Sequence, residues 1–193
     1  MRHSLTVEGH AFRLRPVELS DAGFIVELRT DPLRNRYIHR GAVDVRAQED
    51  WLEEYFQRPG DYYFVIENRS TREREGTVGI YDLDLEARAA EWGRWIVRSG
   101  SLAALESACL VYSAAFDVLD LDSVYCRTIL ENKPALAFQD SFGVERTRLL
   151  PRYFERNGRW MDAVEGRLTR ARWMAMRENT MAKAARAAAW SVG

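Results

Sequence analysis

Residues 89–119 read AAEWGRWIV, RSGS and LAALESACLVYSAAFDVL, and this stretch decides the fold. Its first nine residues include Trp92, Trp95, Ile96 and Val97 in a run bounded by charge before it and by Gly100 after it, which predicts a strand. From Leu102 onward, apolar residues recur at steps of three and four and so line one face of a helix. Residues 98–101 are therefore predicted to be a strand-to-helix turn.

This turn has the local chemistry of an anion site. A helix that begins after it directs unpaired backbone N–H groups and the positive end of its dipole back toward residues 98–101. Phosphate is the usual occupant of such a site. Gly100 and Ser101 are also ordinary capping residues, so the turn alone leaves both interpretations open.

The motifs along the chain occur in a recognisable order. Glu91 lies on the predicted strand, Gly100 in the turn and Glu106 in the helix, and they are followed by a strand SVYCRTIL (123–130), the stretch ENKPA (131–135) and FGV (142–144). The tail NGRWMD (157–162) and the pair at 172–173 complete the pattern. This order resembles the GNAT acyltransferase superfamily, and more narrowly its ribosomal-protein and amino-sugar N-acetyltransferase branch.

The resemblance implies an α/β fold with a mixed central sheet, splayed at the acetyl-CoA strand and flanked by helices. In the superfamily, the gap beside this strand admits the pantetheine arm of acetyl-CoA, which pairs like an added strand. Asn132 would either cap the next helix or reach the cofactor with its amide. The cofactor-binding residues expected from the resemblance are Trp95, Ile96, Val97, Arg98, Gly100, Ser101, Leu102 and Asn132.

Acetyl transfer to an amine requires a neutral amine, because a protonated primary amine cannot attack a thioester. Glu91 matches the acidic position of the family and is the predicted catalytic base. The alternative is a glutamate at a strand start that faces water. A backbone N–H near Trp95 to Val97 would polarise the thioester carbonyl.

Two positions depart from the family pattern. Leu102 stands where many members have a second glycine in the pyrophosphate turn, and it cannot approach phosphates as freely as glycine. Gln139 stands where many members have a tyrosine that protonates the departing thiolate, and an amide cannot supply that proton. Water, Tyr125 or Tyr153 could take that role, or no acid is used.

A basic loop, residues 29–40, follows the first predicted helix and matches the position of part of the acceptor pocket in the amino-sugar branch. Its expected substrate-binding residues are Arg29, Arg34, Arg36 and Tyr37, since guanidinium groups fit phosphate in two-point contacts. The alternative interpretation is a surface loop whose arginine side chains face water. Together with the segment 39–54, the loop resembles the corresponding part of acetyltransferases of the pseudaminic acid pathway.

The acceptor therefore predicted first is the amine of a nucleotide-linked amino sugar. The runner-up is the N-terminal amine of a protein, for which a shallow open groove would be expected. A third interpretation, favoured by Gln139 and Leu102, is a non-catalytic acyl-CoA-binding or dimerising module.

Composition fits a globular cytoplasmic protein, and the acceptor that the resemblance implies is a small-molecule amine. The 193 residues carry a formal net charge of −1, which gives no general attraction to nucleic acid or to anionic membranes. Cys109 and Cys126 are expected in the core, and the three histidines lack ligand-like spacing, so no metal is expected. No leader or membrane-spanning stretch is expected.

Two units are predicted, an acetyltransferase domain over 1–168 and an Ala-rich helical extension over 169–193. The extension would bury Trp173 and Met174 on one side, either on its own domain or in a homodimer. Within the domain, we expect strands in 5–17, 62–67 and 77–83, helices in 20–31 and 44–58, and a closing hairpin from 144–153 and 158–168.

Overall fold

The computed structural model describes residues 3–32, 35–38 and 41–189. Its centre is one sheet of eight strands in the order β1-β2-β3-β4-β5-β6-β8-β7. The strands are β1 (Val7–Glu8), β2 (Phe12–Pro16), β3 (Tyr62–Asn68), β4 (Arg74–Asp84), β5 (Ala89–Val97), β6 (Ser123–Ile129), β7 (Glu145–Arg156) and β8 (Arg159–Thr169). The helical elements are η1 (Leu19–Asp21), α1 (Ala22–Thr30), η2 (Asn35–Tyr37), α2 (Val45–Tyr55), α3 (Ala103–Ser113), η3 (Ala114–Val118), α4 (Lys133–Ser141) and α5 (Arg170–Ala189).

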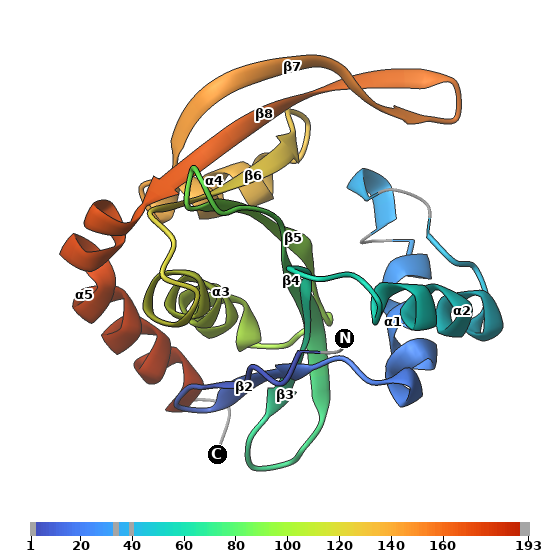
Figure 1. The fold of residues 1–193 in the computed structure, drawn as a ribbon, viewed down its shortest axis with the longest axis horizontal. Helices are drawn as coiled ribbons and strands as arrows, with labels where there is room; N and C mark the ends of the chain where they lie inside the picture. Colours follow the sequence, from blue (N-terminus) through green and yellow to red (C-terminus); the bar gives the residue numbers. More distant parts are fainter. Residues whose placement is uncertain (1–2, 33–34, 39–40, 190–193) are drawn as a thin grey trace.

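Helices cover both faces of the sheet. In Figure 1, α3 and α5 lie on one side of the central strands and α1 and α2 on the other, while the β7–β8 hairpin arches above them. The largest apolar cluster lies under α3, and a second cluster under α1 and α2 includes Ile25, Leu52 and Val65. The predicted mixed sheet with flanking helices and a C-terminal helix is confirmed.

Most predicted elements agree with the structure, with local corrections. β5 has the predicted bounds, and β3 and β4 are antiparallel neighbours as expected. The helix predicted over 102–119 is regular only to Ser113 and continues as the π-helical segment η3. β4 begins at Arg74 rather than Thr77, because the Asn68 side chain closes a shorter turn by accepting from the backbone N–H groups of Ser70 and Thr71.

The start of the first helix also differs from the prediction. The helix expected over 20–31 begins with the short η1, and α1 starts at Ala22; the Asp21 carboxylate between them is buried and receives a two-point contact from Arg15, at 2.8 and 2.9 Å. It also accepts from the backbone N–H of Glu18. The carboxylate therefore ties η1 to β2 in place of capping α1.

The feature that positions the site is the separation of β5 from β6. These parallel strands pair only from Ala89 to Glu91, opposite residues 123–125, after which β6 continues along β8. On its other edge, β5 stays paired with β4, but Val78 alone on β4 stands opposite two residues of β5, Arg94 and Trp95. Two residues opposite one form a β-bulge, and this bulge bends β5 where the gap opens.

The C-terminal helix packs against its own chain. Trp173 is fully buried within the main core and Ala184 is buried with it, whereas Met174 is 45% exposed. The expectation that Met174 shares the buried side is therefore wrong, since it lies one position off the face that meets α3. The boundary at residue 169 between two units stays a prediction.

Among the helices of the described residues, none combines the length and the apolar character needed to cross a bilayer.

Candidate active site

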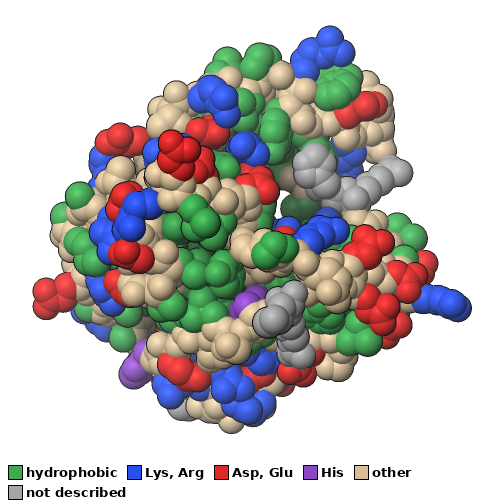
Figure 2. Space-filling model, viewed as in Figure 1, with side chains coloured by type: hydrophobic (Ala, Val, Ile, Leu, Met, Phe, Trp, Pro, Cys, Tyr) green, Lys and Arg blue, Asp and Glu red, His purple; other side chains and the backbone are tan. Residues whose placement is uncertain are grey.

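A cavity of about 400 Å³ lies where β5 and β6 diverge, on the face covered by α1 and α2. Figure 2 shows the surface hollowed beside the β7–β8 side of the molecule, with basic and acidic side chains at its edge. The cavity is lined by Arg29, Tyr37, Ile38, Gly41, Ala42, Gln48, Trp51, Tyr63, Tyr81, Glu91, Trp92, Gly93, Arg94, Arg127, Ile129, Tyr153 and Phe154.

Glu91 is the carboxylate of this cavity. It occupies the last paired position of β5, opposite Tyr125 on β6, and is only 5% exposed. The alternative of a glutamate that faces bulk water is therefore wrong. Arg127 Nη1 donates to its Oε2 atom at 2.8 Å. Burial raises the pKa of Glu91 above its usual value, and the positive charge of Arg127 offsets part of that rise.

Arg127 is itself held in place. Its guanidinium lies 5.2 Å from the ring centroid of Tyr125, and its Nε atom lies 3.7 Å from Glu165 Oε2 on β8. Tyr153, from β7, adds a hydrogen bond to it. The Glu91 carboxylate is thus fixed through Arg127 to three strands on one side of the gap.

Tyr81 faces Glu91 from the other side. The two residues are partners in the β4–β5 register. Burial raises the pKa of the Tyr81 hydroxyl, and the neighbouring Glu91 charge raises it further, so the hydroxyl stays protonated near neutral pH. Gly93 is required beside it, because a Cβ atom there would come within 2.3 Å of the Tyr81 hydroxyl oxygen.

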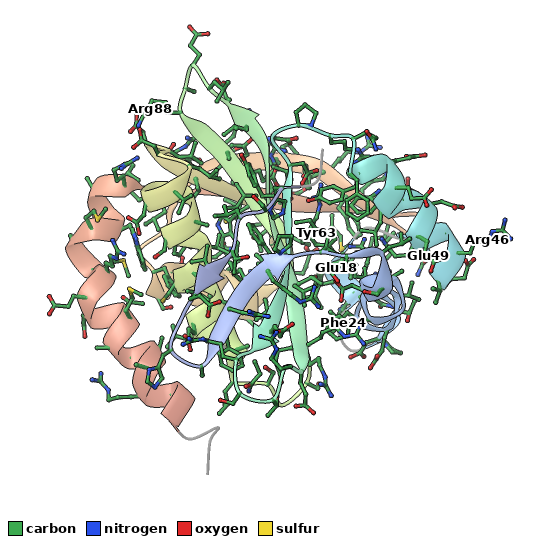
Figure 3. All side chains as sticks on the ribbon, turned by 60° about the horizontal axis from the view of Figure 1, so that its bottom comes forward. Glu18, Phe24, Arg46, Glu49, Tyr63 and Arg88 are labelled. Atoms are coloured by element: carbon green, nitrogen blue, oxygen red, sulfur yellow. The ribbon has the colours of Figure 1, made fainter. Side chains whose placement is uncertain are left out.

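The lining is rich in arginine and aromatic rings. Arg29 from α1, Arg94 from β5 and Arg127 from β6 line the cavity together with the Glu91 carboxylate. Among its rings are Trp51 from α2 and tyrosines from β3, β4 and β7. Figure 3 shows Arg46 projecting outward from α2, whereas Tyr63 lies near the centre of the molecule.

The predicted substrate-binding residues of the loop 29–40 differ in their relation to the cavity. Arg29 and Tyr37 line the cavity. Arg36 is not among the lining residues; its guanidinium lies 5.2 Å from the Tyr37 ring centroid. Arg34 lies outside the described residues.

The β7–β8 hairpin completes the cavity wall. Tyr37 of η2 packs on a small apolar cluster that includes Ile129 and Phe154. Arg156 donates to the Asn35 backbone carbonyl and, at 3.0 Å, to its side-chain oxygen. The loop before α2 and the far end of the hairpin are thus joined beside the part of the cavity that Tyr37 and Phe154 line.

The turn at 98–101 lies open to solvent at the start of α3. Gly100 has a φ of +78°, and a Cβ atom built there would meet nothing within 4 Å, so the turn opens to solvent. Ser101 Oγ accepts from the Ala103 N–H at 3.1 Å and so caps α3. Leu102 is 45% exposed at the helix start. The Asn132 side chain accepts from Ala135 N–H at 3.4 Å, the capping alternative of the two foreseen.

The opposite face of the gap holds the other predicted residues. Gln139 Nε2 on α4 donates to Thr128 Oγ1 on β6 at 2.7 Å. The Trp95 indole donates to Ser107 Oγ on α3 at 3.1 Å. Of the two tyrosines considered as thiol acids, Tyr153 lines the cavity and Tyr125 does not.

Several lining residues were not predicted from the sequence. Arg127 carries the clearest missed signal, because it is the one charged residue in the strand 123–129. Tyr81, Trp51 and Arg94 have no comparable signal, since each lies in a segment where an aromatic or charged residue is ordinary.

Comparisons with known proteins agree with this geometry. The family model described as the Acetyltransferase (GNAT) domain matches residues 12–145. No curated protein sequence matches the chain.

Solved structures resemble it over most of its length. A structure described as apo FdhC, a nucleotide-linked sugar GNAT, is 25% identical with a TM-score of 0.77, over 92% of this chain and 97% of that one. A GCN5-related N-acetyltransferase from Brucella melitensis is 19% identical with a TM-score of 0.80, over 93% and 85%. Mutant forms of the spermidine/spermine N-acetyltransferase SpeG from Vibrio cholerae are 20% identical with a TM-score of 0.74, over 86% and 97%. The last two likenesses show the fold alone.

Proposed function

The chain belongs to the GNAT acetyltransferase family and transfers acetyl from acetyl-CoA to an amine, and we propose that Glu91 is the base for an amine bound in the cavity beside it. The observation that carries this proposal is a buried carboxylate at the point where β5 and β6 part. A base must lie within reach of the amine and be ionised when the amine is bound. Glu91 is the candidate for both needs, because it lines the cavity and the charge of Arg127 offsets part of the rise in pKa that burial causes.

Acetyl-CoA supplies the acetyl thioester from the gap between the two strands. The backbone of Trp95, Ile96 and Val97 would pair with the pantetheine arm, since β6 does not pair with this part of β5. Residues 98–102 would hold the pyrophosphate at the start of α3, where the positive end of the helix dipole favours an anion. Asn132 would border the same site from the start of α4 while it caps that helix.

In the reaction, a C–N bond to the amine replaces the C–S bond of the thioester. Glu91 takes the proton that the amine must lose, and a backbone N–H of the β5 bulge stabilises the negative charge on the carbonyl oxygen. Of the two tyrosines considered from the sequence, only Tyr153 lines the cavity, so it is the one proposed to protonate the leaving thiolate, with water as the alternative. Gln139 is committed to Thr128 and supplies no proton.

The acceptor we infer is an amino sugar that carries a nucleotide diphosphate. Arg29, Arg94 and Arg127 line the cavity. Arg94 is paired with Asp61 and Arg127 with Glu91, so we propose that Arg29 meets the phosphate groups, and the aromatic rings offer faces for a base or sugar. The likeness to a nucleotide-linked sugar GNAT supports this class of acceptor. The resemblance of the loop 29–40 to the amino-sugar branch supports it as well.

A protein N-terminus is the second candidate. It would suit a shallow open groove, whereas the cavity is bounded by the β7–β8 hairpin tied to η2 through Arg156 and Asn35. The enclosed shape therefore favours a small molecule.

The test is a panel of amines with acetyl-CoA, in which release of free thiol and the mass of the product are both recorded. The panel holds UDP- and TDP-linked amino sugars, the same sugars without the nucleotide, spermidine and short peptides. Turnover of nucleotide-linked sugars above the others supports the proposal. Turnover confined to peptides or to spermidine would overturn the acceptor class.

A further inference from the structure

The bulge in β5 is anchored from the far side of the cavity by an ion pair. Arg94 Nη1 and Nη2 lie 2.5 and 2.8 Å from the two carboxylate oxygens of Asp61, which precedes β3. The side chains are 19% and 11% exposed, so the pair is largely shielded from water. Two-point contact of this kind fixes direction as well as distance.

Aromatic rings surround the same guanidinium. Its Cζ atom lies 4.3 Å from the ring centroid of Tyr81, 5.3 Å from that of Tyr63 and 5.5 Å from that of Trp51. The Tyr55 hydroxyl donates to the Asp61 backbone carbonyl at 3.1 Å and accepts from the Tyr63 N–H at 2.8 Å. Arg94 therefore cannot change direction without breaking contacts to β3, β4 and α2.

The backbone of Arg94 is the unusual part of the bulge. Its φ is +52°, a conformation that a residue with a Cβ atom adopts at a cost in free energy. Such a conformation persists only where the surroundings determine it. The Asp61 pair and the three rings are the surroundings that hold the side chain of this residue.

A hydrogen bond from β4 fixes the orientation of the peptide unit between Arg94 and Trp95. Thr77 Oγ1 on β4 donates to the Arg94 carbonyl at 3.0 Å. In a trans peptide, the C=O and the N–H of one unit point in opposite directions. The N–H of the same unit belongs to Trp95, and it is therefore directed away from Thr77, toward the side on which β6 has left the sheet.

We propose that the Asp61–Arg94 pair is a positioning device that holds the β5 bulge so that the Trp95 N–H faces the thioester carbonyl. Arg94 and Asp61 act here through the backbone and not by contact with the reacting atoms. The inference rests on the proposed function, because it requires acetyl-CoA in the gap. Its test is designed so that the two can fail separately.

The experiment measures the carbonyl stretching frequency of acetyl-CoA, labelled with ¹³C at the acetyl carbonyl, when bound without any acceptor. A hydrogen bond to this carbonyl lowers its frequency. The wild-type protein is expected to shift the band to lower frequency, and Asp61→Asn is expected to lose most of that shift, while acetyl-CoA affinity changes less than threefold. With an acceptor, kcat of Asp61→Asn is expected to fall at least tenfold, less than the roughly 10² to 10³ for complete removal of an oxyanion donor, because the N–H is misdirected and not removed.

A matched control uses the second buried two-point pair, Asp21 with Arg15, which joins η1 to β2 away from the gap. Asp21→Asn is expected to lower thermal stability but to keep the wild-type frequency. Asp61→Asn is the preferred variant because Asp61 does not line the cavity. If Asp61→Asn does not fold, the experiment uses Arg94→Gln.

The outcomes separate the two claims. Failure of the wild-type protein to bind acetyl-CoA, or a bound band at the frequency of free acetyl-CoA, would overturn the proposed use of the gap. A wild-type shift that survives in Asp61→Asn and Arg94→Gln would overturn the positioning role alone. A loss of shift in Asp21→Asn as well would assign the effect to general loosening and would also overturn it.

Discussion

Nη1 of Arg127 on β6 lies 2.8 Å from Oε2 of Glu91 on β5, and this ion pair spans the two parallel strands at the place where their pairing ends. The exposed fractions of the side chains are 26% and 7%. Removing one partner of a shielded pair leaves the other charge without compensation. The pair therefore links the ionisation of the proposed base to the geometry of the gap.

Glu91→Gln is predicted to lower kcat by about 10² to 10⁴, because the variant cannot accept the proton of the amine. The amide keeps the size of the side chain, and Glu91 is not among the proposed acetyl-CoA contacts, so the Kd of acetyl-CoA should stay within a few-fold of wild type. Steady-state rates and calorimetric titration measure the two effects.

Glu67→Gln is the matched control for this change. Glu67 is also 5% exposed and is bonded to two arginines, Arg13 and Arg15, but it lies on β3 outside the cavity lining. Equal loss of turnover in both variants would show that the effect comes from a buried charge in general and not from a base.

The rate should depend on pH through Glu91. Burial raises the pKa of this carboxyl and Arg127 opposes the rise, so activity is lost as the pH falls through a value above the ordinary glutamate range. Arg127→Gln removes the opposing charge and is predicted to move the acid limb of kcat/KM to still higher pH. An acid limb that does not move between the two proteins would count against Glu91 as the titrating group.

Arg29→Gln is predicted to raise KM for a nucleotide-linked amino sugar by roughly 10-fold to 100-fold, the worth of one charge-assisted hydrogen bond to phosphate. The KM for the same sugar without its nucleotide should change little. Arg36→Gln provides the comparison, because Arg36 stacks on Tyr37 and does not line the cavity. If Arg36→Gln has the larger effect, the assignment of the phosphate contact to Arg29 is wrong.

Trp173→Ala is predicted to destabilise the protein by about 3 to 5 kcal/mol, as expected when a fully buried large aromatic side chain is truncated. Met174→Ala, at the adjacent 45% exposed position, should cost much less. Thermal or urea unfolding compares the two. Similar small losses in both would mean that α5 does not share the core of the domain, and would favour the two-unit division at residue 169.

Sequence alone predicted the elements that carry long, regular patterns. β5 and the turn after it were predicted because an apolar strand, a glycine and a three-to-four residue repeat follow one another without interruption. Glu91 was identified from the family order of motifs. Its burial could not be predicted, because that depends on β6 and α2 closing over the strand.

The rest of the site depends on contacts between residues far apart in the chain. Arg94 meets Asp61 from 33 positions away, and Arg127 meets Glu91 from 36 positions away. Neither pair leaves a periodic pattern. The bulge at Arg94 is likewise invisible in the sequence, since an arginine with positive φ has no residue signature of the kind that glycine gives.

The central claim is that the cavity holds an anionic, nucleotide-linked amine for attack on acetyl-CoA. The most direct measurement is the ratio of kcat/KM for a UDP- or TDP-linked amino sugar to that for the same amino sugar without its nucleotide, taken from thiol release at saturating acetyl-CoA. The account predicts a ratio of at least 100 in favour of the nucleotide-linked sugar, most of it lost in Arg29→Gln. A ratio near one, or turnover of spermidine above both sugars, would contradict it.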